Sequence, residues 1–216
     1  MDISREYLFS NTKCLKLNIP FPHEEILKEA SALKNKFVEY RSTYKTKGWY
    51  SLPIIGKSSK EPYAWSEYYN NCQDAVSDMQ WTEIANYCPI TKQWLEQVYP
   101  SNHYARVRFM LLEPGGYIEP HTDTNHKVLG AVNFAISNPK ECVWHWDEGT
   151  LNFLPGDGYA VNISYTHSVK NNSDQDRYHL IVHHYDSTDE SDQQKDLDEL
   201  RTQKTRLLFD SLSYSV

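Results

Sequence analysis

The sequence predicts a mainly β protein, a sandwich or barrel with helices before it and a helix or tail after it. From residue 104 onward, short segments rich in β-branched and aromatic residues alternate with Gly, Pro and Asn turns. No helical pattern separates these segments, which disfavours a parallel α/β sheet. The chain has 216 residues and 39% hydrophobic residues, enough for one domain with a buried core.

Two helices are expected before the β segments. Apolar residues recur with a 3.6-residue period over 23–40, which predicts an amphipathic helix. Pro89 at the first turn of 89–98 favours a second, shorter helix. Between them, 41–80 combines Gly and Pro with many aromatic residues, a composition typical of a loop. We therefore expect residues 1–103 to form a helical and loop extension packed on the core.

The β core is expected over 104–186, with Pro114-Gly115-Gly116 as a turn after its first strand. After residue 186 the chain becomes polar and charged, and 187–216 is expected to be a C-terminal helix or tail. The expected strands are 104–112, 128–136, 142–146, 150–154, 159–163 and 178–185.

Charge, cysteine content and hydropathy argue against a nucleic acid partner, a disulfide framework and a membrane segment. The formal net charge is -7, from 29 acidic and 22 basic residues. We see no Lys/Arg cluster that would bind phosphates, so we expect no nucleic acid partner. The four cysteines are far apart and form no CxxC pair, which indicates reduced thiols. Without a secretory signal pattern or a run of ~18 apolar residues, we expect a cytoplasmic protein without a membrane segment.

The strongest chemical signal is His121-Thr122-Asp123 followed by His167. Two imidazoles and one carboxylate are typical of the Fe(II) site of non-haem oxygenases, where they leave coordination positions open. On an extended segment alternate side chains leave the same face, so His121 and Asp123 can reach one ion. His167 follows after a stretch long enough for several strands, and can return beside them.

Each of these residues also has an explanation that involves no metal site. An HxD pair alone is a weak signal, and a lone histidine such as His167 is more often exposed or hydrogen-bonded than a ligand. Arg177 offers a planar fork for a carboxylate, or is a surface residue paired with Asp174 or Asp176. Taken together, the pattern of turns, ligands and arginine favours a metal site with an acidic co-substrate.

Two segments resemble the aspartyl/asparaginyl β-hydroxylase family of Fe(II)/2-oxoglutarate dioxygenases. They are RVRFMLLEPGGYIEPHTD at 106–123 and HSVKNNSDQDR at 167–177. The resemblance covers about 104–186, whereas the first hundred residues resemble no family that we can name. It implies a double-stranded β-helix, a relative of the jelly roll and of the cupins.

The resemblance also implies roles for individual residues. His121 and His167 would bind Fe(II), and Arg177 would bind the distal carboxylate of 2-oxoglutarate. Asn133 occupies a position where the family often has a polar residue that supports this co-substrate. The best-known animal members lack a carboxylate at the position of Asp123, so this chain looks like the ordinary three-ligand site. Fe(II), 2-oxoglutarate and O2 are the implied cofactor and co-substrates.

The implied activity is hydroxylation of an amino acid, or of an Asp/Asn-type or prolyl residue in a peptide or protein, with release of succinate and CO2. Arg106 and Arg108 alternate along a strand toward the site, where they would meet a substrate carboxylate or face solvent. Trp49 and other aromatics of the 41–80 segment would form a substrate lid or fill the core.

The remaining histidines are expected to pack in the core or face solvent. They are His126, His145, His179, His183 and His184. Two other classes of function stay open at the level of the sequence. One is a cupin-like metalloenzyme that does not use 2-oxoglutarate, and the other is a catalytically inactive jelly-roll binding module.

Overall fold

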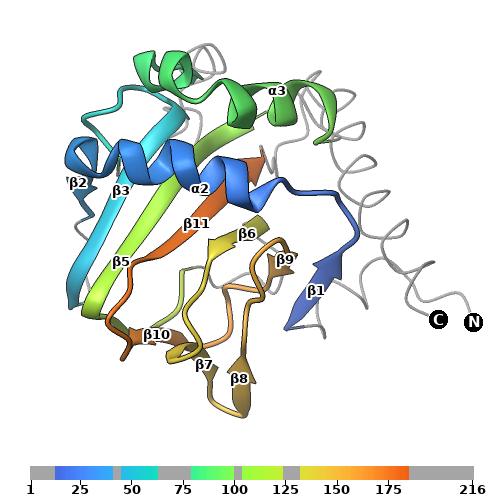
Figure 1. Cartoon of the computed structure of the whole chain (residues 1–216). Coiled ribbons are helices and arrows are strands. Elements are labelled where there is room, and N and C mark those ends of the chain that lie inside the picture. The colour runs from blue at the N-terminus through green and yellow to red at the C-terminus, as the bar shows by residue number, and fades with distance from the viewer. Residues whose placement is uncertain (1–12, 41–44, 63–78, 100–103, 124–131, 185–216) are drawn as a thin grey trace, which may run out of the picture.

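The computed structural model describes residues 13–40, 45–62, 79–99, 104–123 and 132–184 (Figure 1). The helices are α2 (His23–Ala32) and α3 (Pro89–Gln97), with 3-10 turns η1 (Lys34–Lys36) and η4 (Glu83–Tyr87). The strands are β1 (Cys14–Leu17), β2 (Val38–Glu39), β3 (Thr46–Gly56), β4 (Gln80–Trp81), β5 (Tyr104–His121), β6 (Val132–Ser137), β7 (Cys142–Trp146), β8 (Gly149–Leu151), β9 (Gly158–Val161), β10 (His167–Asn171) and β11 (Arg177–His184).

The strands form one curled antiparallel sheet, a half-barrel of the double-stranded β-helix type, as the sequence predicted. Its strand order is β1-β9-β6-β11-β5-β10-β7-β8, and β3 pairs with β5 outside this path. The long strand β5 is central: its first half pairs with β11, and its second half pairs with β10. The start of β10 is therefore brought beside the end of β5, far from it in sequence.

Strand alternation gives the sheet two different faces. Val107, Phe109 and Leu111 of β5 pack in the larger core cluster with residues of α2 and α3, and Figure 1 shows both helices together on one side of the sheet. Met110 and Leu112 face the other way, into a second cluster that contains no residue of either helix. This second face is the concave face of the half-barrel.

Glu29 links the two helices. Its carboxylate accepts hydrogen bonds from the backbone N–H groups of Ile90 (2.6 Å) and Thr91 (3.0 Å) and from the Thr91 hydroxyl (2.6 Å). These N–H groups lie in the first turn of α3, where a helix has no internal acceptors and favours negative charge. A residue of α2 thus caps α3, which was expected over 89–98 and ends at Gln97.

The structure corrects the expected elements before residue 104. The helix expected over 23–40 ends at Ala32 and gives way to η1 and β2. Within the segment expected to be a loop, Thr46–Gly56 is an eleven-residue strand. Residues 51–56 are buried on both faces, so they show neither alternation nor helical period. Pro53 is tolerated because a register shift between Pro53 and Ile55 interrupts the ladder.

Pro114-Gly115-Gly116 is a bulge and not the expected turn. Lys47 of β3 pairs with Tyr117, but Trp49 pairs with Leu112, so β5 carries extra residues between these two pairs. Gly115 has φ 70°, a left-handed value that glycine adopts without strain. The strand therefore continues to His121.

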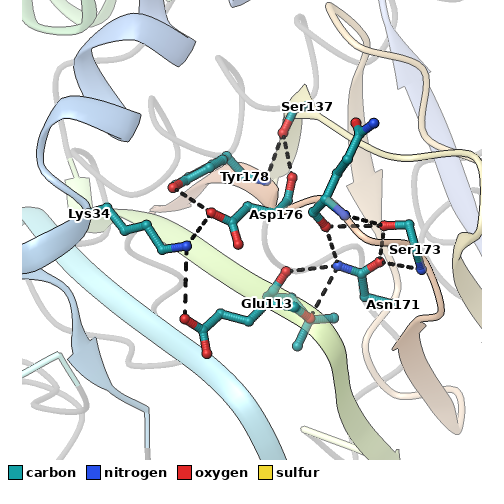
Figure 2. A network of polar contacts seen from close by, with 9 residues as sticks. Lys34, Glu113, Ser137, Asn171, Ser173, Asp176 and Tyr178 are labelled. Atoms are coloured by element: carbon teal, nitrogen blue, oxygen red, sulfur yellow. Dashed lines mark hydrogen bonds and ion pairs between the residues drawn. The ribbon is translucent and has the colours of Figure 1, made fainter.

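A buried side chain holds this bulge against the β10–β11 turn (Figure 2). The Asn171 amide group donates to the carbonyls of Leu112 (3.0 Å), Glu113 (3.2 Å) and Gln175 (2.8 Å). Its oxygen accepts from the backbone N–H and the hydroxyl of Ser173. The side chain uses its full hydrogen-bonding capacity and fixes where β10 ends and where β11 begins.

The strands expected over 142–146 and 159–163 are found as β7 and β9 with small changes of boundary, and 150–154 shortens to β8. The described parts of the strands expected over 128–136 and 178–185 lie in β6 and β11, whereas 128–131 and 185 lie outside the described residues. Strands β1, β4 and β10 were not expected. Residues 187–216 lie outside the described part of the chain. In the described part, no helix is long and apolar enough to cross a membrane. The division of the chain at residue 104 stays a prediction, although β3 shows that earlier residues contribute to the sheet itself.

Candidate metal centre

The backbone brings the three expected ligands together. His121 ends β5 and His167 begins β10, and the two residues are direct cross-strand partners. Asp123 follows two residues after His121, and its backbone N–H donates to the carbonyl of Ile163 at 3.0 Å. Sheet pairing and this one loop contact therefore determine the positions of all three side chains.

The ligand atoms form a compact group. Nε2 of His121 lies 3.5 Å from one carboxylate oxygen of Asp123, and Nε2 of His167 lies 3.6 Å from the other. All three ligand atoms lie within 4.8 Å of one another. Ligands held about 2.1 Å from one octahedral ion are separated by about 3 Å when adjacent, so small side-chain movements would suffice to close around an ion.

Backbone carbonyls fix which nitrogen of each histidine is available. Nδ1 of His121 is 2.7 Å from the carbonyl of Glu119, and Nδ1 of His167 is 2.9 Å from the carbonyl of Tyr165. A carbonyl only accepts hydrogen bonds, so both Nδ1 atoms carry the proton. Both Nε2 atoms then present lone pairs toward Asp123, the arrangement that outer-shell partners impose on metal-ligating histidines.

The electrostatics keep His167 in the form that binds metals. The residue is 3% exposed, and its pKa is lowered because burial outweighs the raising effects of the Tyr165 carbonyl and the Asp123 charge. The ring also stacks on the indole of Trp144. A neutral imidazole is the metal-binding form. The donor set, its tautomers and its burial therefore fit a divalent ion such as Fe(II).

Arg177 is buried and not the surface residue that was one alternative. It is 3% exposed, its Nε donates to Oδ1 of Asn138 (3.2 Å), and its Nη2 lies 2.9 Å from Nδ1 of His179. Asp176 instead pairs with Lys34. Among the residues that the structure describes, no carboxylate forms an ion pair with Arg177. Burial lowers the pKa of Arg177, but a guanidinium stays charged in proteins, so this cation has no anionic partner in the described part of the chain.

The other expected site residues lie on the concave face. Arg106 (1% exposed) and Arg108 (5%) are buried, which rules out the solvent-facing alternative, and both donate to the carbonyl of Pro62. Asn133 is buried on β6, in register between Ile181 and Tyr159. Trp49 belongs to the concave-face cluster. His126 lies outside the described residues, as do the aromatics of the 41–80 segment that fall in 63–78, including Trp65 and Tyr68.

Sequence reasoning missed Tyr40. The Arg108 guanidinium lies over the Tyr40 ring at 4.6 Å and is hydrogen-bonded to its hydroxyl. Burial alone would raise the pKa of Tyr40, but the positive charges of Arg108 and Arg106 outweigh it and the pKa is lowered. The Tyr40 ring also packs edge-on against Trp49 at 4.4 Å. The 3.6-residue period placed Tyr40 at the end of the helix expected over 23–40, whereas in the structure it follows the two-residue strand β2.

An aromatic wall joins the triad to Arg177 and was also missed. Trp144 contacts His167 and Phe153, and Phe153 in turn contacts His179 and lies 5.9 Å from the Arg177 guanidinium. The period-two alternation of 142–146 could have placed Trp144 on one face with Cys142. Nothing in the sequence marks Phe153, which follows β8 in a loop.

A half-barrel with HxD and a distal histidine on neighbouring, directly paired strands is the arrangement of the Fe(II)/2-oxoglutarate oxygenases. An oxidoreductase of the 2OG-Fe(II) oxygenase family from Burkholderia pseudomallei superimposes with a TM-score of 0.52 at 13% identity, over 82% of this chain and 87% of that chain. A Pseudomonas putida prolyl-4-hydroxylase gives a TM-score of 0.46 at 11% identity, over 83% and 97% of the two chains. At 13% identity the likeness to the Burkholderia protein shows the fold alone.

The sequence itself gives the family. The model of the aspartyl/asparaginyl β-hydroxylase family matches residues 22–186, more than half of the chain, and the protein belongs to that family. The match begins far before residue 104, so the expectation that the first hundred residues resemble no family was wrong. A search of curated proteins found no match. The family comprises 2-oxoglutarate-dependent hydroxylases that use Fe(II).

Proposed function

We propose that this protein is an Fe(II)- and 2-oxoglutarate-dependent hydroxylase of a free amino acid or of an amino acid residue in a peptide or protein. The overall reaction takes a substrate C–H bond, O2 and 2-oxoglutarate to C–OH, succinate and CO2. The observation that carries the proposal is a buried cation, Arg177, connected by an aromatic wall to a His-Asp-His group. A 2-oxo dicarboxylate could bind the ion held by the His-Asp-His group at one end and neutralise Arg177 at the other.

His121, Asp123 and His167 would hold the ion through two Nε2 atoms and one carboxylate oxygen. The bound ion supplies the redox chemistry of dioxygen and 2-oxoglutarate, which no side chain provides. The protein contributes placement. Because the Glu119 and Tyr165 carbonyls fix the tautomers, the ligands need no proton loss from the imidazoles when the ion binds.

Arg177 would bind the distal carboxylate of 2-oxoglutarate, since a guanidinium matches a carboxylate with two parallel hydrogen bonds. Asn138 orients the guanidinium through Nε. Trp144 and Phe153 would line the co-substrate and exclude water, which strengthens each polar contact. Asn133 would support the co-substrate from β6, on the same face of the sheet as Ala135.

The substrate would carry a carboxylate that Arg108 binds, with Arg106 beside it. Among the described residues Arg108 has no carboxylate partner, and its Nε is buried without a hydrogen bond. Tyr40 lies against Arg108, and its hydroxyl also interacts electrostatically with Asp123. A substrate carboxylate on Arg108 would therefore lie near the metal centre. Trp49 would contact the substrate from β3, behind Tyr40.

The test is anaerobic addition of Fe(II) and 2-oxoglutarate to the purified protein, followed by its visible absorption. A weak charge-transfer band of chelated 2-oxoglutarate is expected. His167→Ala should lose bound iron and the band, whereas Arg177→Ala should keep the iron and require far more 2-oxoglutarate. The matched controls are His145→Ala and Lys170→Ala, substitutions at exposed residues, and both should behave as wild type. Bound iron without a band would favour a cupin-like enzyme that does not use 2-oxoglutarate.

The substrate class is tested separately by succinate release. Free amino acids and Asp- or Asn-containing peptides are supplied with the carboxylate intact or amidated. We expect amidation of the recognised carboxylate and Arg108→Gln each to reduce turnover about tenfold or more. Binding of 2-oxoglutarate by Arg108→Gln should be unchanged. Equal turnover of acid and amide would remove Arg108 from substrate recognition.

A further inference from the structure

His179 is a completely buried histidine on the concave face, two residues after Arg177 on β11. The sequence favoured packing or solvent for it over a contact with the pocket. Its Nδ1 lies 2.9 Å from Nη2 of Arg177. A guanidinium can only donate, so Nδ1 accepts this hydrogen bond and is unprotonated. A neutral His179 therefore carries its single N–H on Nε2.

The surroundings keep His179 neutral. Burial and the positive charge of Arg177 hold the pKa of His179 well below its usual value. The imidazole accordingly offers one fixed donor at physiological pH, and its acceptor nitrogen is already used by Arg177.

Among the described residues this donor has no hydrogen-bond acceptor. Nε2 of His179 is buried, and within the described part of the chain no hydrogen-bond acceptor meets it. The cross-strand neighbours of His179 are Met110 on β5 and Ala135 on β6, which offer at most a thioether sulfur, a weak acceptor. Buried N–H groups are nearly always paired in folded proteins, and since the described residues offer no acceptor, a bound ligand is a candidate for this role.

The position of this donor points to one acceptor. His179 contacts Phe153 edge-on, with ring centroids 4.8 Å apart, and Phe153 also lies beside Arg177 and Trp144. His179 thus lies at the Arg177 end of the aromatic wall, away from the triad. An anion that neutralises Arg177 would come within reach of the neighbouring imidazole.

We propose that His179 is a second binding residue for the distal carboxylate of the 2-oxo dicarboxylate, donating from Nε2 while Arg177 supplies the charge. The inference rests on the proposed function, because it assigns a further contact to the same co-substrate. It also gives His179 two tasks: its Nδ1 orients the Arg177 guanidinium, and its Nε2–H binds the ligand.

The experiment compares two ligands and three proteins. 2-Oxoglutarate and 2-oxopentanoate share the 2-oxo acid group, but only the first has a distal carboxylate. Both are titrated anaerobically into Fe(II)-loaded wild type, His179→Leu and His179→Gln, with the dissociation constant from the chelate band and iron content measured separately. We expect His179→Leu to bind 2-oxoglutarate about 10- to 100-fold more weakly and 2-oxopentanoate with unchanged affinity.

His179→Gln should recover most of the loss, since its amide can accept from Arg177 and donate to the carboxylate. A purely structural role would weaken both ligands equally, and that result would overturn the proposal. Equal 2-oxoglutarate affinity in wild type and His179→Leu would overturn it and leave the proposed function intact. A wild type that binds iron but neither ligand would overturn both.

A measurement on wild type covers the case in which the variants do not fold. In the protein loaded with diamagnetic Zn(II), the Nε2–H proton resonance of His179 should shift downfield when 2-oxoglutarate binds. 2-Oxopentanoate should leave it in place. A resonance that does not respond to 2-oxoglutarate would overturn the proposal without any substitution.

Discussion

The rings of Trp144 and His167 stack face to face, with centroids 4.6 Å apart and planes at 3°. The two residues come from adjacent strands, β7 and β10, where Trp144 pairs with Val169. The stack holds the plane of the imidazole, and the hydrogen bond to the Tyr165 carbonyl fixes its rotation. His167 is thereby oriented before any ion binds.

Trp144→Leu should therefore weaken metal binding about 10- to 100-fold, the range for loss of an outer-shell partner of a metal ligand. Trp144→Phe should keep most of the affinity, because a flat ring still supports the imidazole. Anaerobic Co(II) titration would measure both. Trp81→Leu, at an exposed tryptophan, is the control. A Trp144→Leu protein with wild-type affinity would show that the stack does not position His167.

The Asn171 network in Figure 2 predicts an order of stability. Asn171→Ala would leave the carbonyls of Leu112, Glu113 and Gln175 without their side-chain donor, at a cost of about 2–3 kcal/mol. Asn171→Asp should cost more, because a carboxylate would face three carbonyl oxygens. Urea unfolding measures the order, with the exposed neighbour Asn172→Ala as control. An Asp variant as stable as the Ala variant would contradict it.

In the bulge of β5, Gly116 has no room for a side chain, whereas the adjacent Gly115 has room but a left-handed backbone conformation. A Cβ on Gly116 would lie 2.7 Å from the Glu113 carbonyl oxygen and 2.9 Å from that of Lys47, both rigid backbone atoms. Gly116→Ala should lower the free energy of unfolding by about 1–3 kcal/mol and disturb the path of β5 to His121. Gly115 has open space around it at φ 70°, so Gly115→Asn should be nearly neutral. Thermal unfolding and Co(II) binding test the pair, and equal effects would contradict the bulge geometry.

The low pKa of His179 predicts how stability depends on pH. The unfolded chain takes up a proton near pH 6.5, whereas the folded protein does so only far below that value. The unfolded state then binds more protons, so stability is full above about pH 6.5 and falls as pH decreases toward the folded pKa.

His179→Gln removes this site and should make the acid-side slope shallower by up to about 1.4 kcal/mol per pH unit. Urea unfolding of metal-free wild type and variant between pH 7 and pH 5 measures the difference. His145→Gln, at an exposed histidine, should retain the wild-type slope. A slope that is the same in His179→Gln and wild type would mean that His179 is not held neutral.

The residue pattern was sufficient for the short helix at 89–98, most core strands and the three candidate ligands. These features depend on local signals: a proline at the first helical turn, period-two alternation, and an i, i+2 pair on an extended segment. Strand β3 was missed because 51–55 is buried on both faces, and such a run has no period to detect.

By itself, the sequence determined the chemical groups: two imidazoles and one carboxylate at spacings that suit one ion, with an arginine after them, within a family signature. Only the tertiary structure decided which groups become buried and which meet. It buries His179 and leaves His145 exposed, and it gives Arg177 an imidazole and an amide as partners in place of Asp174 or Asp176. The reason is physical: burial and partner choice follow from the register between strands far apart in the chain, and no local pattern encodes that register.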